Sequence, residues 1–172
     1  MEKAKSFANV QSRFKLEERK MIVNKELANS KGCNQKDKWE TPSKIFDELN
    51  EKIQFTLDPC CETHTAKCKK FYTEQDNGLI QDWTGEIVFV NPPYSRGNID
   101  VWMKKCYEES LKGVVIIALI PVSTSSKWFH NYVLGHADLK FYKGRLRFKG
   151  APFTAPFSSM LAIYNVSNLK CL

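Results

Sequence analysis

Apolar residues gather in short runs along most of the chain. Two runs are continuous and strand-sized, EIVFV at 86–90 and VVIIALIPV at 114–122, and a run of this kind is typical of a strand buried on both faces. Weaker apolar patterns predict further strands at 55–58, 71–73, 137–150 and 158–166.

Between these runs, apolar residues recur at helical spacing. One such stripe predicts a helix over 42–52, with Thr41 as its N-cap and Pro42 as its first helical residue. A second stripe predicts a helix over 98–113, capped by Asn98. Three further segments are predicted more coarsely: a helix-compatible stretch at 63–70, a short element at 79–83 and a helix at 123–135.

This alternation of strands and helices predicts the α/β class. A mostly parallel sheet with helices on both faces is the architecture that such an order favours. The last two strands have no helix between them, so we expect them to pair antiparallel near the C-terminus.

Positive charge is concentrated at the start of the chain. The formal net charge is +7, and residues 1–38 hold ten Lys/Arg against five Asp/Glu. We interpret 1–38 as a basic N-terminal arm, mobile or helical, and 39–172 as the folded domain. A basic excess suits a polyanionic partner, although a solvated tail explains it equally well.

Composition argues against a membrane or secreted protein. No apolar run approaches the roughly 20 residues that a membrane span needs, and the charged start of the chain has no apolar segment typical of a signal peptide. A 172-residue chain with 42% hydrophobic residues does not need its six cysteines as disulfides, so we expect reduced thiols and a cytoplasmic location. Both a monomer and a homo-oligomer are compatible with the sequence.

The strand at 86–90 runs directly into Asn91-Pro92-Pro93-Tyr94. Proline cannot continue a central strand, and consecutive prolines stiffen the backbone. The Asn91 side-chain oxygen and the Pro92 carbonyl can therefore accept both hydrogens of one –NH₂ group, while Tyr94 stacks on the ring that carries it. An adenine amine is a poor nucleophile, and two preorganised acceptors would free its lone pair without a strong base.

The NPPY tip resembles the [DNS]PP[YFW] motif of S-adenosylmethionine-dependent amino-methyltransferases. More narrowly, the chain from 39 to about 165 is similar to the phage-type DNA N-6-adenine methyltransferases, the Dam-like family. The segments that carry this resemblance are WETP at 39–42, LDPCC at 57–61, NGLIQDW at 77–83, VFVNPPYS at 88–95 and APFSSMLAIY at 155–164.

The resemblance implies a Rossmann-like methyltransferase fold for 39–172 and methylation of the N6 amino group of adenine in DNA. It assigns catalysis to Asn91, Pro92, Pro93 and Tyr94. Because a duplex adenine is buried by stacking, a DNA substrate implies base flipping. If the chain is encoded by a phage or prophage, its location is the host cytoplasm.

The resemblance also implies an S-adenosylmethionine site. The residues expected to form it are Trp39, Thr41, Pro42, Asp58, Pro59, Cys60, Asp76, Asp82 and Trp83. LDPCC lacks the usual glycine-rich loop, so Pro59 and Cys60 would have to supply the close backbone approach. Glu74 or Asp76 would hold the ribose, Asp82 the adenine amine, and Trp83 would cover the adenine ring. We rank Asp82 ahead of Asp76 and Asp76 ahead of Glu74.

Basic residues alternate in KGRLRFKG at 143–150. In a strand, Lys143, Arg145, Arg147 and Lys149 would share one face and could contact DNA phosphates. Charge that shields an edge strand from aggregation is an equally good explanation.

Two other functions are compatible with the sequence. The same tip can act on an RNA base or on a glutamine amide in protein, since all of these present a planar –NH₂ group. Alternatively, Cys60, Cys61, His64 and Cys68 could form a structural zinc site in a nucleic-acid-binding module without catalysis. Their spacing departs from that of zinc ribbons and fingers, so the prediction is an enzyme without a metal.

Overall fold

The computed structural model describes residues 17, 21 and 39–168. The predicted basic arm therefore lies outside the described residues, except for Glu17 and Met21. The helices are α2 (Ser43–Ile53), α3 (Asn98–Ser110), α4 (Lys127–Tyr132) and the 3-10 turn η2 (Val166–Asn168). The strands are β1 (Leu57–Asp58), β2 (Lys70–Phe71), β3 (Ile87–Val90), β4 (Val115–Pro121), β5 (Asp138–Phe141) and β6 (Ser159–Tyr164).

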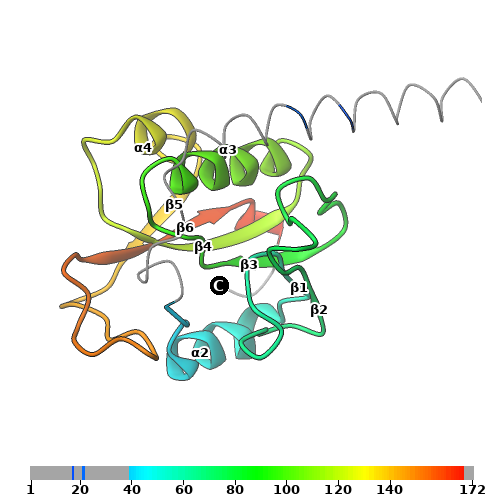
Figure 1. Cartoon of the computed structure of the whole chain (residues 1–172). Helices are drawn as coiled ribbons and strands as arrows, with labels where there is room; N and C mark the ends of the chain where they lie inside the picture. The colour runs from blue at the N-terminus through cyan, green and yellow to red at the C-terminus, as the bar shows by residue number, and fades with distance from the viewer. Residues whose placement is uncertain (1–16, 18–20, 22–38, 169–172) are drawn as a thin grey trace, which may run out of the picture.

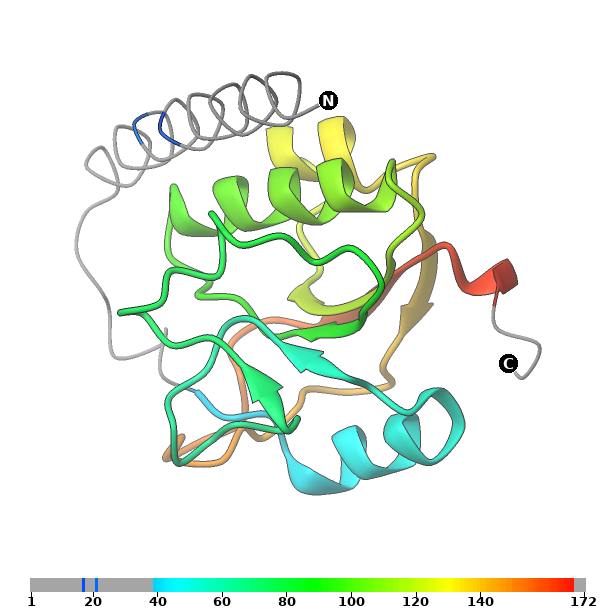
Figure 2. The same ribbon diagram turned by 90° about the vertical axis from the view of Figure 1, so that its right-hand side faces the viewer.

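The strands form one six-stranded sheet in the order β2-β1-β3-β4-β6-β5. The pairs from β2 to β4 are parallel, whereas β6 runs antiparallel to both β4 and β5. Helix α2 covers one face of the sheet, and α3 and α4 cover the other (Figure 1, Figure 2). This arrangement confirms the predicted α/β class with its antiparallel C-terminal strand. Among the described helices, none has the length and apolarity that a membrane crossing requires.

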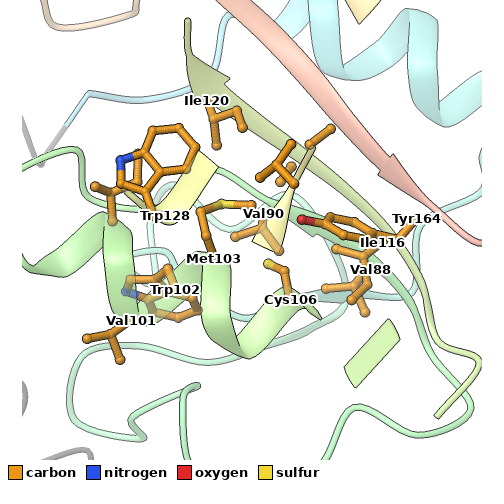
Figure 3. Packing of buried hydrophobic residues seen from close by; sticks show 14 of the residues in the cluster. Val88, Val90, Val101, Trp102, Met103, Cys106, Ile116, Ile120, Trp128 and Tyr164 are labelled. Atoms are coloured by element: carbon orange, nitrogen blue, oxygen red, sulfur yellow. The ribbon is translucent and has the colours of Figure 1, made fainter. Parts of the chain in front are cut away.

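The two apolar runs supply both faces of the sheet. In β3, Val88 and Val90 face α3, whereas Phe89 packs with Phe46 of α2 on the other side. β4 alternates in the same way, because successive side chains in a strand point to opposite faces. Figure 3 shows the core on the α3 side, where Trp102, Met103 and Cys106 contact the sheet. Full burial on both faces explains why these strands contain no polar residue.

Both predicted helix caps are wrong. Thr41 is buried, Pro42 occupies the N-cap position, and no described side chain caps α2. The Pro42 carbonyl accepts from Ile45 and Phe46 at 3.0 and 3.2 Å. Asn98 is the first residue of α3, and the capping position belongs to Gly97 with a φ of 92°. That positive φ explains why a glycine stands there.

Three segments are less regular than predicted. Residues 63–69 form turns, bends and irregular backbone and not a helix, and Lys70 already belongs to β2. Thr65 Oγ1 bonds the backbone of Glu62 and competes with helical hydrogen bonds. Residues 79–83 also form turns, and α4 occupies only the centre of 123–135. The predicted strand 137–150 stops at Phe141, before Gly144, whose φ of 80° leaves the β region. Within the described chain, residues 142–150 form one isolated β-bridge, between Lys149 and Glu40, and no further strand.

Candidate active site

Strands β1 and β3 are neighbours, and the chain leaves their carboxyl ends in opposite directions along the sheet. β1 continues to the edge strand β2, whereas β3 continues to β4 on the other side. In open α/β sheets, the crevice at such a switch point is the usual ligand site. Asp58 ends β1 and Asn91 follows β3, so both border this crevice.

The Asn91 amide is held in one orientation. Its Nδ2 donates to the Trp39 carbonyl at 2.9 Å, across 52 positions of sequence. With the amide nitrogen committed, Oδ1 is the acceptor that the side chain presents. The Tyr94 hydroxyl donates to this oxygen at 2.6 Å. A carbonyl oxygen has two lone pairs, so Oδ1 retains acceptor capacity for a further N–H group.

Tyr94 is packed at the tip and does not extend into solvent. Its hydroxyl lies 3.0 Å from the Leu119 carbonyl as well as 2.6 Å from Asn91 Oδ1. Burial raises the pKa of this hydroxyl well above its ordinary value, and the neighbouring Cys60 adds to the shift. The hydroxyl therefore stays protonated near neutral pH and acts as a hydrogen-bond donor to the tip.

Two phenylalanines pack against the Tyr94 ring. The centroid of Phe148 lies 6.0 Å away and that of Phe157 5.5 Å away, both in edge-on geometry. Trp39 stacks on Phe148 with centroids 5.6 Å apart. These four rings surround the tip on the α2 side of the sheet, and aromatic pairs in such geometries add roughly 0.5–1.5 kcal/mol each beyond area burial.

Three distant segments meet at this edge of the sheet. The backbones of Glu40 and Lys149 exchange hydrogen bonds of 3.3 and 3.0 Å, and Lys149 Nζ lies 3.0 Å from Glu40 Oε2. The loop between β5 and β6 therefore runs beside the start of α2, next to the turn after β3 (Figure 1). The structure thus brings the WETP segment and the NPPY tip together.

Asp58 holds a loop closed. It is only 4% exposed, and its two oxygens accept from the backbone N–H groups of Cys60 at 3.4 Å and Lys67 at 3.1 Å. Burial raises the pKa of Asp58 despite these bonds. The carboxylate fastens residues 60–67 to the end of β1, and in this conformation it is not presented to a ligand.

The close backbone approach that a glycine permits does occur here, but the glycine comes from another segment. Gly78 lies so near Pro59 that a Cβ on it would stand 2.1 Å from the Pro59 carbonyl oxygen. Gly78 also accepts at its own carbonyl from Trp83 Nε1 at 3.0 Å. The absence of a Cβ at Gly78 therefore allows the 76–83 loop to pack directly against the turn after β1.

The acidic candidates lie in different places. Asp76 follows β2, and its Oδ2 accepts from the Thr73 backbone and hydroxyl, which lowers the pKa of Asp76. The side chain of Asp82 is 70% exposed. Its Oδ1 accepts from the Thr84 hydroxyl and lies 3.2 Å from Lys112 Nζ. Both contacts lower the pKa of Asp82, and the Thr84 hydrogen bond contributes most. Lys112 follows the end of α3, a helix about 20 Å long that starts beside the tip. Asp82 therefore lies away from Asn91. Asp76 follows β2, at the same edge of the sheet at which Asn91 follows β3.

Trp83 is a core residue. Its ring is fully buried, stacks on Trp102 at 6.3 Å, and has Lys105 Nζ 5.1 Å from its centroid. Lys105 also donates to the Gln81 carbonyl and to buried Glu109. A ring with no exposed surface cannot cover a cofactor without a rearrangement of its loop. The structure gives Trp83 the role of anchoring 76–83 to α3.

The basic residues of 143–149 are exposed, although the strand predicted for them is absent. Lys143, Arg145 and Arg147 face solvent, whereas Leu146 is half-buried and Phe148 is fully buried. The segment is extended enough to alternate inward and outward without pairing as a ladder. The charged side chains are thus exposed in the same segment as Phe148, which packs against the aromatic cluster.

The cysteine cluster shows no metal site. No group of three His, Cys, Asp or Glu side chains in the described part of the chain is arranged to hold a metal ion. Burial raises the pKa of the Cys68 thiol to about 12, and it also raises that of Cys61.

A groove of about 350 Å³ lies between the first turns of α3 and α4, and Asp100, Lys104 and Lys127 are among its lining residues. No residue predicted for the site lines it.

Several residues of the site were missed in the sequence. Phe148 and Phe157 pack against Tyr94, the Leu119 carbonyl accepts from it, and Gly78 makes the closest backbone approach. Phe148 could have been found from the sequence. Leu146 and Phe148 are apolar residues that alternate with the charged residues of 143–149, which is typical of a segment with one side turned inward. The other contacts link segments whose proximity has no local signature.

Comparisons with known proteins identify the family of the chain. The family model for DNA N-6-adenine-methyltransferase (Dam) matches residues 29–163. The chain is 34% identical over 96 residues to the DNA N-6-adenine-methyltransferase of Haemophilus phage HP1 (strain HP1c1), with 55% of each chain covered. It is 32% identical over 96 residues to the DNA N-6-adenine-methyltransferase of Escherichia phage T1, covering 55% of this chain and 40% of that protein. The matches thus span about half the length of these relatives.

Proposed function

Because the chain belongs to the Dam family of DNA N-6-adenine-methyltransferases, we propose that it methylates the N6 amino group of adenine in DNA. The observation that carries this proposal is the fixed Asn91 amide. Its nitrogen is occupied by the Trp39 carbonyl, so its oxygen is the acceptor left at the end of β3.

In this proposal, Asn91 Oδ1 and the Pro92 carbonyl accept the two hydrogens of the adenine amine. Accepting both N–H bonds draws the nitrogen lone pair out of conjugation, so that it can attack the methyl carbon of the donor while the carbon–sulfur bond breaks and its electron pair returns to sulfur. The methylated nitrogen then releases one of its two protons to solvent. The Tyr94 hydroxyl, already on Oδ1 at 2.6 Å, holds the acceptor in place. The Tyr94 ring lines the position of the flipped base, supported by the Phe148 and Phe157 edges.

The methyl donor is S-adenosylmethionine, which supplies a methyl group bonded to a positively charged sulfur. The acidic side chains near the carboxyl end of β2 are hydrogen-bond acceptors of the kind that the hydroxyl groups of such a cofactor require. Asp76 and Glu74 are exposed acids after β2 and can accept from ribose hydroxyls. Cys60 and the segment Trp39, Thr41 and Pro42 are proposed to contribute as well, since Cys60 is close to Tyr94 and the Trp39 carbonyl bonds Asn91. Asp58 acts indirectly here, because it shapes the 60–67 loop through the Cys60 and Lys67 amides.

We now propose that Asp76 contributes more to cofactor binding than Asp82, supported by the position of Asp76 after β2 and by the contact of Asp82 with Lys112. Asp76→Ala should weaken S-adenosylmethionine binding by about tenfold or more, as expected for loss of hydrogen bonds to a charged acceptor. Asp82→Ala should change binding by less than about threefold, because Asp82 is tied to Lys112 beyond α3. Calorimetric titration of both variants checks this. A larger loss for Asp82→Ala would place the adenine of the cofactor along α3 and contradict the assignment.

Nucleic acid is favoured over a protein substrate by the charge beside the tip. Lys143, Arg145 and Arg147 are exposed on the loop that contacts Tyr94 through Phe148. Such side chains neutralise phosphates, and each phosphate neutralised adds roughly 0.9 to the log–log salt slope on duplex DNA. The arm at 1–38 would add to the same interaction.

Incubation of the protein with methyl-labelled cofactor and three acceptors tests the proposal. The acceptors are unmodified duplex DNA, RNA of the same sequence and a glutamine-containing peptide. We expect label in DNA alone, at a rate that falls steeply with salt. If the label were found chiefly in RNA or in the peptide, the substrate would be a planar –NH₂ group other than that of adenine in DNA, and the proposal would be wrong.

A further inference from the structure

Phe153 is the most exposed of the large apolar side chains described. It is 79% exposed, whereas Phe148 and Phe157, on either side of it in sequence, are buried and half-buried. Leaving an aromatic ring in water forgoes the stabilisation of burial. An aromatic residue at such a place is expected where a ligand covers it.

The loop that carries Phe153 is fixed at both ends. Ala151 and Ala155 are buried, and their N–H groups donate to the carbonyls of Phe148 at 3.2 Å and Leu146 at 2.8 Å. Pro152 and Pro156 restrict the backbone between and after these anchors. Phe153 is therefore presented on a constrained turn and not on a free loop.

This turn is coupled to the catalytic tip. The two residues that bracket it, Phe148 and Phe157, are those whose ring edges contact Tyr94. Arg145 and Arg147 precede it and are exposed. One side of the tip therefore combines positive charge with a projecting aromatic ring, the combination that binds a phosphate backbone and stacks on bases.

We propose that Phe153 enters the DNA base stack and fills the space that the target adenine leaves when it flips toward Asn91. The inference rests on the proposed function, and it makes Phe153 a positioning residue for that reaction. Apolar wedges that enter a base step partly unstack it and hold the duplex distorted. Flipping has an unstacking and unpairing cost, which is smallest where the base is already unpaired. A filling ring should therefore matter most for a fully paired target.

The test compares two synthetic duplexes built on a site that the wild-type protein methylates in amplified DNA. In one, the target adenine is paired with thymine; in the other, an abasic site stands opposite it. Phe153→Ala should lower methyl transfer by about 10- to 100-fold on the paired duplex and by less than about threefold on the abasic one. Phe153→Trp should restore transfer on the paired duplex, because the stacking surface is kept.

Phe141→Ala is the matched control, since it removes another exposed phenylalanine, 57% exposed on the edge strand β5. It should leave both rates unchanged. Equal losses on the two duplexes for Phe153→Ala, or no loss on either, would overturn the wedge. If the wild-type protein transferred no methyl group to any DNA, the proposed function itself would fail, and this inference with it.

Discussion

Asn91→Ala is expected to lower methyl transfer to adenine by about 10²- to 10³-fold, the loss typical for one preorganised acceptor or donor at a transition state. The variant removes Oδ1, the acceptor that the Trp39 carbonyl and the Tyr94 hydroxyl hold in place at 2.9 and 2.6 Å. It also removes two hydrogen bonds, so unfolding should become easier by about 1–3 kcal/mol. Binding of S-adenosylmethionine should change little, because Asn91 acts on the acceptor nitrogen. Turnover, cofactor titration and thermal unfolding of the same preparation separate these effects.

Asn91→Asp is the matched control. A carboxylate keeps an oxygen at the tip but cannot donate to the Trp39 carbonyl, a bond worth about 1 kcal/mol. We expect a loss of roughly tenfold, well short of the alanine variant. Equal losses in the two variants, or losses that follow the melting temperature alone, would show that Asn91 has only a structural role.

Gly78→Ala is expected to destabilise the fold by about 3 kcal/mol, at the upper end of overpacking effects. The added Cβ would stand 2.1 Å from the Pro59 carbonyl oxygen, and a backbone atom cannot move aside as a flexible side chain can. For a domain of this size that corresponds to a fall of roughly 6–12 °C in Tm. The displaced loops flank Asp58 and Asp76, so cofactor binding should weaken as well.

Gly85→Ala separates steric overlap from backbone conformation. Gly85 has a φ of 82°, yet nothing lies within 4 Å of its expected Cβ. Alanine there should cost only about 1–2 kcal/mol, the penalty of the left-handed conformation. Thermal or denaturant unfolding of both variants makes the comparison. If Gly78→Ala were no more harmful than Gly85→Ala, the packing of 76–82 against Pro59 would be looser than described.

The parts of the fold that the sequence predicts are those governed by local physics. Continuous apolar runs identify β3 and β4, because both faces of each strand are covered. Prolines follow directly after β3, which ends at Val90, and the stripe in α3 faces the core as expected. These features depend on neighbours within a few positions, so composition and spacing are sufficient to find them.

The structure departs from the expectations where tertiary contacts decide. Asp58 binds the backbone N–H groups of Cys60 and Lys67 and holds the loop between them. Trp83 resembles a ligand-covering aromatic in the sequence, yet packing against Trp102 buries it. Lys112 draws Asp82 toward the far end of α3. Trp102 and Lys112 lie far in sequence from Trp83 and Asp82, so local patterns cannot rank these two side chains.

The aromatic surroundings of the tip show the same limit. The four-residue motif NPPY predicts Asn91 and Tyr94, but their partners Trp39, Phe148 and Phe157 come from segments more than 50 residues away. Only the three-dimensional arrangement reveals that the Tyr94 hydroxyl bonds Asn91 directly.

Nucleoside analysis of unmodified duplex DNA after incubation with the protein and S-adenosylmethionine tests the central claim most directly. The DNA is digested to nucleosides, and mass spectrometry identifies which base carries the added methyl group and at which atom. The account predicts N6-methyldeoxyadenosine with the wild-type protein and its near absence with Asn91→Ala. DNA left unmodified by the wild-type protein, methylation of another base alone, or equal N6-methyldeoxyadenosine from both proteins would contradict it.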